Sequence, residues 1–483
     1  MADNLKRKTS LALFWSFVDK GGQQVIQLVF FYILSRLIAK DEIGVVGVLA
    51  LFTAVANLLQ DSGFSSALIR KKEVSPQEYT SVFYFNISIS IFIYIVFFLA
   101  APAISWYYEK PVLTNLSRFI FLAFVFNAFA TIQNVNLMKK LDFKSNTRIT
   151  LFAGCISGLV AIAMAYYGFG VWSLAAQQVL QAFLRSSLLW MFVKWRPEGG
   201  YRHVHIREMS SFSLKLLLTA LLNQVCSNIF PLIIGKRFSF EQVAAYGQGN
   251  KLTSTPQSII SEGIKSVAYP LLTNVGEEGT RGKKVFRKIV RITAFISFPV
   301  GLLLIVLAKP VVAFYLPKEW SDVVPILQIL AVGGAVYPLY GLVSSLLQYK
   351  GKSGTMLRIE VFRNILLLLS ILISIKYGVV GLVAGISLVN IVAFCVGIYI
   401  SGKTILYTLK EVFLDVAPYM AIAGISFLPL LFLNKLGIEN MYLLFAVPLV
   451  VGSFLYLLIV KLLGSVVLQE TIDFVKQSFK KSC

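Results

Sequence analysis

Fourteen stretches of mostly apolar residues follow one another along this chain of 483 residues, and short connections join them. An α-helix rises about 1.5 Å per residue, so roughly 20 residues are needed to cross the hydrocarbon core of a bilayer. The stretches cover 11–36, 43–69, 81–103, 113–138, 146–168, 170–193, 211–234, 242–272, 289–308, 323–348, 355–376, 379–402, 412–433 and 441–463. Because no connection could hold a folded domain and no run alternates as a barrel strand does, the sequence predicts an all-α polytopic membrane protein with about 14 transmembrane helices.

The composition supports this class, and the charges orient the chain. Hydrophobic residues make up 57% and charged residues 14%, whereas a soluble chain carries roughly 45–50% and about 25%. A net charge of +22 would indicate nucleic acid in a soluble protein. With the N-terminus placed in the cytoplasm, 28 basic residues fall on the cytoplasmic side of the predicted spans and 8 on the external side. Because basic connections mark the cytoplasmic side, we predict that both termini are cytoplasmic and that nucleic acid is not a partner.

The chain contains a weak internal duplication. Matches at an offset of 210 join residues 137–140 with 347–350, Arg148 with Arg358, and 167–168 with 377–378. Other matches at offsets of 200 to 208 extend it, so the first six spans repeat as the next six in the same orientation. In transporters built in this way the substrate site lies between the repeats. We therefore predict two pseudo-symmetric six-helix lobes plus two C-terminal helices, with an N-lobe at 1–197, a C-lobe at 198–403, and helices 13–14 with a cytoplasmic tail at 404–483.

Polar side chains recur every three or four residues on several predicted helices, and this spacing places them on one helical face. Ionisable groups at membrane depth are costly and usually face a cavity or a partner. We predict that the following basic residues face a cavity and bind a diphosphate: Lys20, Arg148, Arg185, Lys215, Lys251, Lys265, Arg358 and Arg363. Amides on the same helices can hydrogen-bond sugar hydroxyls: Gln23, Gln27, Gln178, Gln181, Asn223 and Gln224. The alternative is that the charges pair with each other or snorkel, and only hold helices together.

Bases outnumber acids among the charges deep in the predicted spans. Six bases stand against four acids, before Arg148 and Arg358 at the inner mouth are counted. A positive wall suits phosphate, since Arg and Lys are its usual partners. The carboxylates Asp61, Glu262 and Glu360 are candidates for coupling transport to a proton or sodium gradient, and the alternative is that they are plain counter-ions. We expect no catalytic residue, no metal site and no cofactor.

Several short motifs make the chain resemble a known superfamily. They are DSGFSSALIR at 61–70, LMKKLDFK at 137–144, GFGVWSL at 168–174, WRP at 195–197, LPKEW at 316–320 and PILQIL at 325–330. On these residues the chain resembles the multidrug/oligosaccharidyl-lipid/polysaccharide (MOP) exporters, and within them the Wzx-like flippases near the colanic-acid and teichuronic-acid exporters. The motifs are structural, so they identify the family better than the cargo.

The resemblance implies two six-helix lobes around a central cavity, with two extra helices that form a lipid-facing groove. The implied cargo is an undecaprenyl-diphosphate-linked oligosaccharide, such as an O-antigen, capsule or exopolysaccharide repeat unit. It is flipped from the cytoplasmic to the outer leaflet of the bacterial inner membrane by alternating access. Membrane lipid and a polysaccharide polymerase are implied partners. The family does not fix which basic residues hold the diphosphate, so that choice depends on the polar stripes.

Two other classes remain open at this point. A drug or cation antiporter of the same superfamily would be expected to carry more acid than base in its cavity, and this sequence has the reverse. A membrane glycosyltransferase or polymerase acting on lipid-linked sugars usually carries carboxylates on a long external loop. Here the predicted external connections are about 3–9 residues, so we predict a transporter and not an enzyme.

Overall fold

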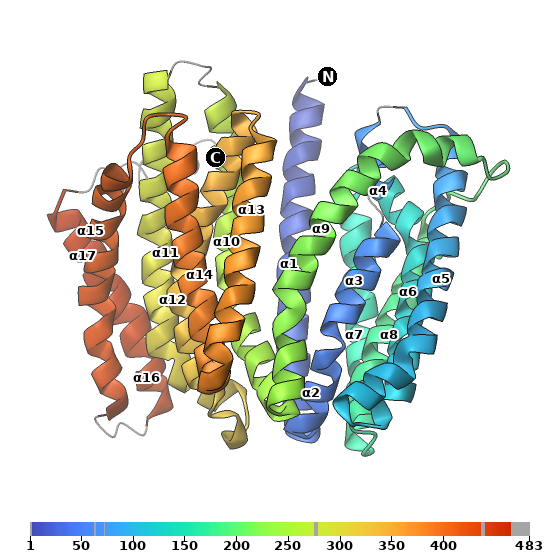
Figure 1. Ribbon diagram of the computed structural model, residues 1–483, viewed down its shortest axis with the longest axis horizontal. Helices are drawn as coiled ribbons and strands as arrows, with labels where there is room; N and C mark the ends of the chain where they lie inside the picture. Colours follow the sequence, from blue (N-terminus) through green and yellow to red (C-terminus); the bar gives the residue numbers. More distant parts are fainter. Residues whose placement is uncertain (1, 62–63, 72, 275–278, 436–439, 465–483) are drawn as a thin grey trace. The chain divides into compact units, whose positions relative to one another are not determined.

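The computed structural model describes residues 2–61, 64–71, 73–274, 279–435 and 440–464, and these residues are helical almost throughout (Figure 1). The first helices are α1 (Ala2–Leu37), α2 (Lys40–Val48), α3 (Ala50–Asp61), α4 (Phe64–Arg70), α5 (Pro76–Tyr108), α6 (Val112–Lys139), α7 (Phe143–Tyr166), α8 (Val171–Phe192) and α9 (His203–Arg237). The next are α10 (Phe240–Asn274), α11 (Gly279–Tyr315), η1 (Lys318–Trp320), α12 (Val323–Tyr349), α13 (Ser353–Ser374), η2 (Ile375–Tyr377) and α14 (Gly378–Gly402). The last are α15 (Leu409–Phe427), η3 (Leu428–Lys435), α16 (Met441–Val447), η4 (Pro448–Gly452) and α17 (Ser453–Leu462).

Each of the fourteen predicted spans falls on one helix or on consecutive helices. The second span is divided among α2, α3 and α4, the thirteenth runs from α15 into η3, and the fourteenth consists of α16, η4 and α17. Within the described ranges there is no strand. The predicted fold class, an all-α polytopic membrane protein with about 14 transmembrane helices, is confirmed.

The predicted spans are not equally apolar. Among the described residues, nine stretches are long and apolar enough to cross a membrane, and one of them, Gly354–Gly402, runs through both α13 and α14. Four long helices fall outside these stretches: α1, α8, α9 and α10. The same four carry the polar stripes that the sequence assigns to spans 1, 6, 7 and 8. Because a helix that is polar on one side needs something other than lipid on that side, these four helices are where a polar site is expected.

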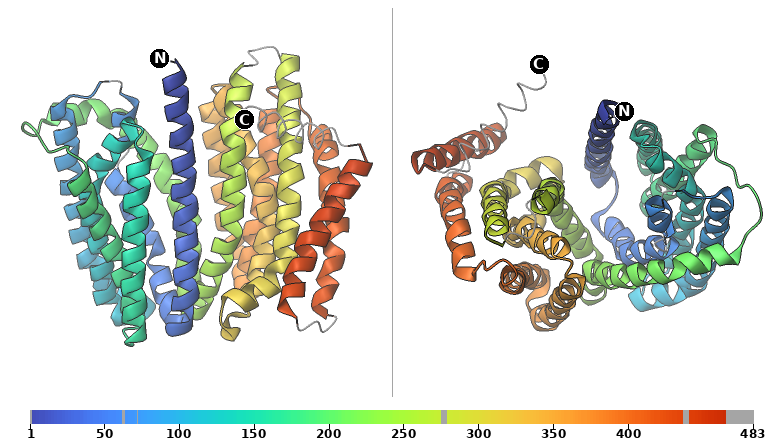
Figure 2. Two further views of the ribbon diagram at one scale, coloured as in Figure 1. Left: turned by 180° about the vertical axis from the view of Figure 1, so that it is seen from behind. Right: turned by 90° about the horizontal axis from the view of Figure 1, so that it is seen from above.

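The chain divides into two compact units, Met1–Ala244 and Ala245–Cys483. Figure 2 shows the helices of each unit running side by side. In the first unit α5 packs on α6, α6 on α8, and α7 on α8; in the second, α11 packs on α12, α12 on α14, and α13 on α14. These three pairings join repeat-related helices, so they match the internal duplication. The first unit also contains α9, which packs on α3 and α5 and which the sequence assigns to the second lobe. The predicted lobe boundaries therefore stay a prediction.

The backbone repeats at the same offset of 210. Leu141 has a φ of 56° and Gly351 a φ of 64°, both just after a helix that ends in the repeated motif. Gly168 and Gly378 follow in the same way, with φ values of 82° and 73°. Left-handed backbone is rare outside glycine because the Cβ approaches the following carbonyl oxygen. Two such positions in the same register therefore support a common origin for α7 and α13.

Close contacts hold α1 against α7 and so place one wall of the site described below. The Thr147 hydroxyl donates to the Trp15 carbonyl at 3.1 Å. A Cβ at Gly22 would lie 2.9 Å from a methyl carbon of Leu151, and a Cβ at Gly158 would overlap the ring of Phe30. Glycine at these two positions is therefore what allows the helices to approach.

Candidate functional site

The first unit contains a polar cavity of about 340 Å³ between α1, α3, α6, α7 and α8. Pockets for small ligands usually measure about 300–1,000 Å³, so this one is large enough for a sugar ring. Its lining has ten polar and four apolar residues: Asp19, Gln23, Thr53, Asn57, Ile120, Ala123, Phe124, Asn127, Asn146, Thr150, Gln178, Gln181, Ala182 and Arg185. Six of the polar residues carry amides. We call this the amide cavity.

One acid and one base face the amide cavity. Asp19 on α1 accepts a hydrogen bond from the Gln23 amide at 3.0 Å. Arg185 on α8 reaches Asn134 with one terminal nitrogen at 3.5 Å, which is a long contact. The two formal charges cancel, so the lining is polar and neutral overall.

Three buried polar atoms in the lining have no hydrogen-bond partner within the part of the chain that the structure describes: Nε of Arg185, Oδ1 of Asn146 and Oγ1 of Thr150. Most buried polar groups in proteins are paired, so each exception calls for an explanation. These three come from α7 and α8 and all border the amide cavity. The residues that carry these atoms line the cavity, so a polar ligand there is one source of the missing partners.

A second polar cluster lies in the second unit, where α12 meets α13. The Tyr340 hydroxyl donates to Glu360 at 3.0 Å, and Arg363 forms an ion pair with the same carboxylate at 3.2 Å. The Arg363 guanidinium also lies 5.7 Å from the centre of the Tyr340 ring. Arg363 is thus paired with an acid of its own helix. Such pairing is the alternative stated for the sequence, in which the charges pair with each other and hold helices together.

The polar face of α10 packs closely on α12. A Cβ at Gly341 would lie 2.8 Å from Cε of Lys265 and 3.0 Å from the Ser261 hydroxyl, and a Cβ at Gly334 would overlap the Gln257 amide. Glycine on α12 therefore makes room for long polar side chains of α10. Of the stripe that the sequence predicts on α10, only Lys265 takes part in this packing, while Ser254, Ser258 and Glu262 are exposed.

The second unit also has a cavity, of about 330 Å³, and its lining is apolar. Residues of α11, α12, α14 and α15 form it, and they include Phe298, Leu339, Ile391, Cys395 and Met420. Such a lining can hold hydrocarbon but offers no hydrogen-bonding groups to a sugar or a phosphate. We call this the apolar cavity.

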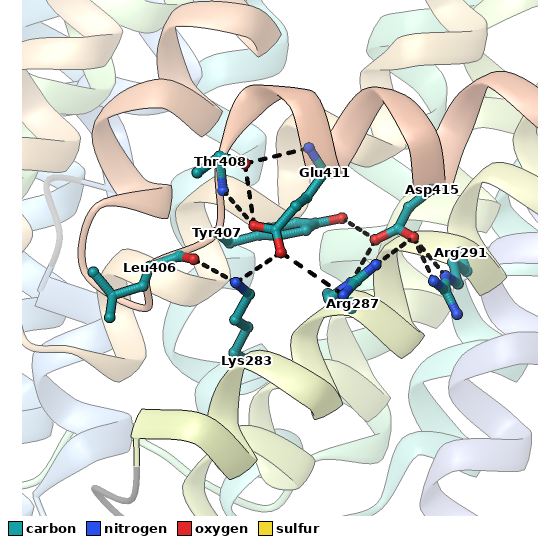
Figure 3. A network of polar contacts seen from close by, with 8 residues as sticks. All are labelled: Lys283, Arg287, Arg291, Leu406, Tyr407, Thr408, Glu411 and Asp415. Atoms are coloured by element: carbon teal, nitrogen blue, oxygen red, sulfur yellow. Dashed lines mark hydrogen bonds and ion pairs between the residues drawn. The ribbon is translucent and has the colours of Figure 1, made fainter.

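A charged network fastens α15 to α11 (Figure 3). The Asp415 carboxylate is 3% exposed and accepts from Arg287 at 2.7 and 3.0 Å, from Arg291 at 2.5 and 2.8 Å, and from the Tyr407 hydroxyl at 2.7 Å. Glu411 pairs with Lys283 at 2.8 Å and caps the start of α15 together with Thr408. The network uses both acids to neutralise most of its bases, so it holds the first of the extra C-terminal helices in place.

The structure places the predicted diphosphate ligands in different settings. Arg185 lines the amide cavity, Lys251 is half-buried on α10, and Arg363 is paired with Glu360. Four others are exposed: Lys20, Arg148, Lys265 and Arg358. The Lys215 side chain lies outside the described residues, as does that of the coupling candidate Asp61.

The predicted sugar-facing amides separate into two groups. Gln23, Gln178 and Gln181 meet in the amide cavity, although they come from α1 and α8. Gln27 is exposed, while Asn223 and Gln224 on α9 are half-buried. The remaining coupling candidate, Glu262, is exposed on α10.

The predicted site residues include four of the ten polar residues in the lining. Among the others, Thr53, Asn127, Asn146 and Thr150 lie on helices that are apolar over most of their length, so they were not selected from the sequence. The sequence predictions also missed Asp415, whose partners on α11 lie 124 and 128 residues earlier in the chain. A buried acid one helical turn after the capping residue Glu411 was the available signal.

Comparison with known proteins agrees with this architecture. The profile of a family described as "Polysaccharide biosynthesis protein" matches residues 33–325, which is more than half of the chain. Teichuronic acid biosynthesis protein TuaB of Bacillus subtilis (strain 168) is 23% identical over 420 residues, covering 85% of this chain and 86% of that protein. Among solved structures, the lipid II flippase MurJ in an inward closed conformation superposes with a TM-score of 0.76 at 14% identity, covering 92% of this chain and 97% of that one. An inward-facing multidrug resistance MATE family transporter of the MOP superfamily has a TM-score of 0.62 at 18% identity, covering 80% and 94%.

The chain thus has the fold of the lipid II flippase MurJ and of the MATE family transporter, as the resemblance in the sequence implied, and it is an integral membrane protein. The chain belongs to the polysaccharide biosynthesis protein family.

Proposed function

We propose that this protein moves a polyprenyl-diphosphate-linked oligosaccharide from the cytoplasmic to the outer leaflet of the bacterial cytoplasmic membrane. The observation that carries the proposal is an amide-lined cavity within a membrane protein of a polysaccharide biosynthesis family. The printed names of TuaB and MurJ, teichuronic acid biosynthesis and lipid II flippase, agree with a saccharide cargo and with a lipid carrier. An O-antigen, capsule or exopolysaccharide repeat unit would fit this class.

The diphosphate follows a path of basic residues: Lys20, Arg148, Lys215, Lys251, Lys265, Arg358 and Arg363. A diphosphate carries charge that is costly to move through a low dielectric, and nearby Lys and Arg offset part of that cost. Lys251 is the best-supported member, because it is half-buried on one of the four helices that lack an apolar stretch. Arg185 was also predicted for this path, but it lines the amide cavity and is left out of the path for that reason.

Transport proceeds by alternating access between the two predicted lobes, 1–197 and 198–403, with both termini in the cytoplasm. The lipid tail stays in the bilayer beside the helices of 404–483. Asp61, Glu262 or Glu360 takes up a proton or sodium ion during the cycle. No bond of the cargo is made or broken, so the protein is a transporter and not an enzyme, and a polysaccharide polymerase would use the flipped product.

The test is a lipid-linked-sugar analysis of a deletion strain of the source bacterium. We expect the strain to accumulate a polyprenyl-diphosphate oligosaccharide on the cytoplasmic side and to lose the matching surface polysaccharide. The wild-type gene should restore export. Lys251→Ala should lower export at least about tenfold, because a desolvated phosphate then lacks a charged partner, and Lys251→Arg should be milder.

The matched control is Lys376→Ala, which removes an exposed lysine of η2 outside the proposed path. It should export as the wild type does. A deletion strain with normal lipid-linked sugars and normal surface polysaccharide would show that the cargo is something else. If Lys251→Ala exports normally while well inserted, Lys251 is structural.

A further inference from the structure

We infer that the first unit holds, within its own amide cavity, a subsite for one uncharged sugar ring, and that the diphosphate does not enter it. The inference rests on the proposed function, because it names the part of the cargo that this cavity recognises. All of the lining residues belong to the first unit, between Asp19 and Arg185. The volume of about 340 Å³ is sufficient for one sugar ring.

The hydrogen-bonding character of the lining selects a hydroxyl-rich ligand. Every amide offers both donors and an acceptor. Sugar hydroxyls also donate and accept, so amides can match them in either direction. Phosphate oxygens only accept, so a phosphate could use the NH₂ groups of the amides but would leave their carbonyls without a partner. The lining is therefore a poor phosphate site and a good carbohydrate site.

The charges in the cavity lead to the same conclusion. Arg185 is the one base of the lining, and Asp19 places a carboxylate in the same space. A diphosphate would meet that carboxylate as a like charge, which costs free energy at low dielectric. A neutral ring meets no such penalty. One hydroxyl of the ring can accept a hydrogen bond from Arg185, and a neighbouring hydroxyl can donate one to Asp19. The pair can therefore select a ring whose hydroxyl groups are placed for both bonds.

The unsatisfied atoms fit a ligand of this size. Nε of Arg185 can donate, whereas Oδ1 of Asn146 and Oγ1 of Thr150 can accept, and none has a partner among the described residues. Ile120 and Phe124, each 1% exposed, form an apolar floor on α6. A pyranose has hydroxyls around its edge and C–H groups on its face, so it could satisfy the polar atoms while its face lies on the apolar floor.

The duplication supplies an internal comparison. Gln178, Gln181 and Arg185 on α8 correspond, 210 positions later, to Leu388, Ile391 and Cys395 on α14. The last two line the apolar cavity of the second unit. The same helix pairings thus carry a polar wall in one copy and an apolar wall in the other. The polar wall is therefore not needed for the packing of this helix, which favours a ligand as the reason for it.

The test replaces the α8 wall with the residues of α14: Gln178→Leu, Gln181→Ile and Arg185→Cys in one full-length protein. Saturation-transfer NMR in detergent would measure binding of methyl glycosides of common hexoses, N-acetylhexosamines and 6-deoxyhexoses. We expect at least one glycoside to bind the wild type and the triple variant to weaken it at least about tenfold, as expected for several lost hydrogen bonds. Inorganic pyrophosphate in millimolar excess should not displace it.

Gln348→Leu is the matched control, since Gln348 is an exposed glutamine of the second unit. It should bind glycosides as the wild type does. If the triple variant does not fold, Gln181→Leu alone should give a loss of about threefold.

Displacement by pyrophosphate, or a wild type that binds none of the glycosides, overturns the subsite. If the glycosides bind as expected but the deletion strain still exports its polysaccharide, the subsite stands and the proposed function is the part that fails.

Discussion

The two units share their helix pairings but differ in what their cavities offer to a ligand. In the first, ten of fourteen lining residues are polar, whereas the lining in the second is apolar. The difference on the repeat-related helices α8 and α14 comes from three positions, Gln178, Gln181 and Arg185 against Leu388, Ile391 and Cys395. The comparison teaches that backbone turns and helix pairings can be preserved between the two copies while the side chains at corresponding positions of α8 and α14 differ in polarity.

We expect the largest effect on stability from a basic residue placed in the apolar cavity of the second unit, at the position that corresponds to Arg185. Cys395→Arg places a guanidinium among the apolar residues of the apolar cavity, where the described lining offers no acid. A basic residue in the centre of a membrane helix costs about 3 kcal/mol of insertion free energy. We expect a strong loss of inserted protein and a lower thermal unfolding midpoint in detergent.

The reciprocal change, Arg185→Cys, is the control for that prediction. It removes a buried charge with a long, weak contact to Asn134, so it should leave the inserted amount and the unfolding midpoint close to those of the wild type. If both variants lose the same amount of inserted protein, the two cavities tolerate charge equally. The difference drawn between the two units would then be wrong.

The next effect concerns how the second unit holds its extra helix. Asp415→Asn removes the negative charge that both Arg287 and Arg291 contact, leaving two bases near each other on α11. Breaking a fully buried ion pair costs about 3–5 kcal/mol, and both arginines here are partly exposed, so we expect a loss of about 2 kcal/mol. The thermal unfolding midpoint of the purified protein would measure it.

Glu411→Gln provides the contrast within the same network. The Glu411 side chain is 28% exposed, and exposed ion pairs contribute little to stability. Its variant should therefore lower the midpoint much less than Asp415→Asn. If the two variants lower it equally, burial of Asp415 is not what makes the network stabilising.

The sequence predicted the helices well because membrane crossing depends on length and apolar content, which are local properties. Of the polar residues that it placed on several helices, Gln23, Gln178, Gln181 and Arg185 meet in one cavity. Periodicity could find them because several polar residues share one helical face.

The rest of the site depends on contacts between helices, which periodicity does not contain. Asn127 and Asn146 lie on helices that are apolar over most of their length, and only the packing of α6 and α7 on α8 brings them to the cavity. Arg287 and Arg291 were assigned to a cytoplasmic connection by their charge, yet they bind Asp415 on α15. A charge count assigns such residues to one end of the helices but cannot identify their partners.

The smallest effect tests whether the backbone repeat is as close as the φ values suggest. Leu141 and Gly351 occupy equivalent left-handed positions, so the reciprocal changes should have opposite signs. Gly351→Leu should destabilise by about 1 kcal/mol: a Cβ there would meet nothing within 4 Å, so the cost is conformational only. Leu141→Gly should stabilise by about 0.5 kcal/mol, because relief of the left-handed leucine is partly offset by the greater freedom of glycine in the unfolded chain. Unfolding midpoints that move in the same direction for both variants would show that the two turns are not equivalent, and the duplication would then extend to the helices but not to the turns between them.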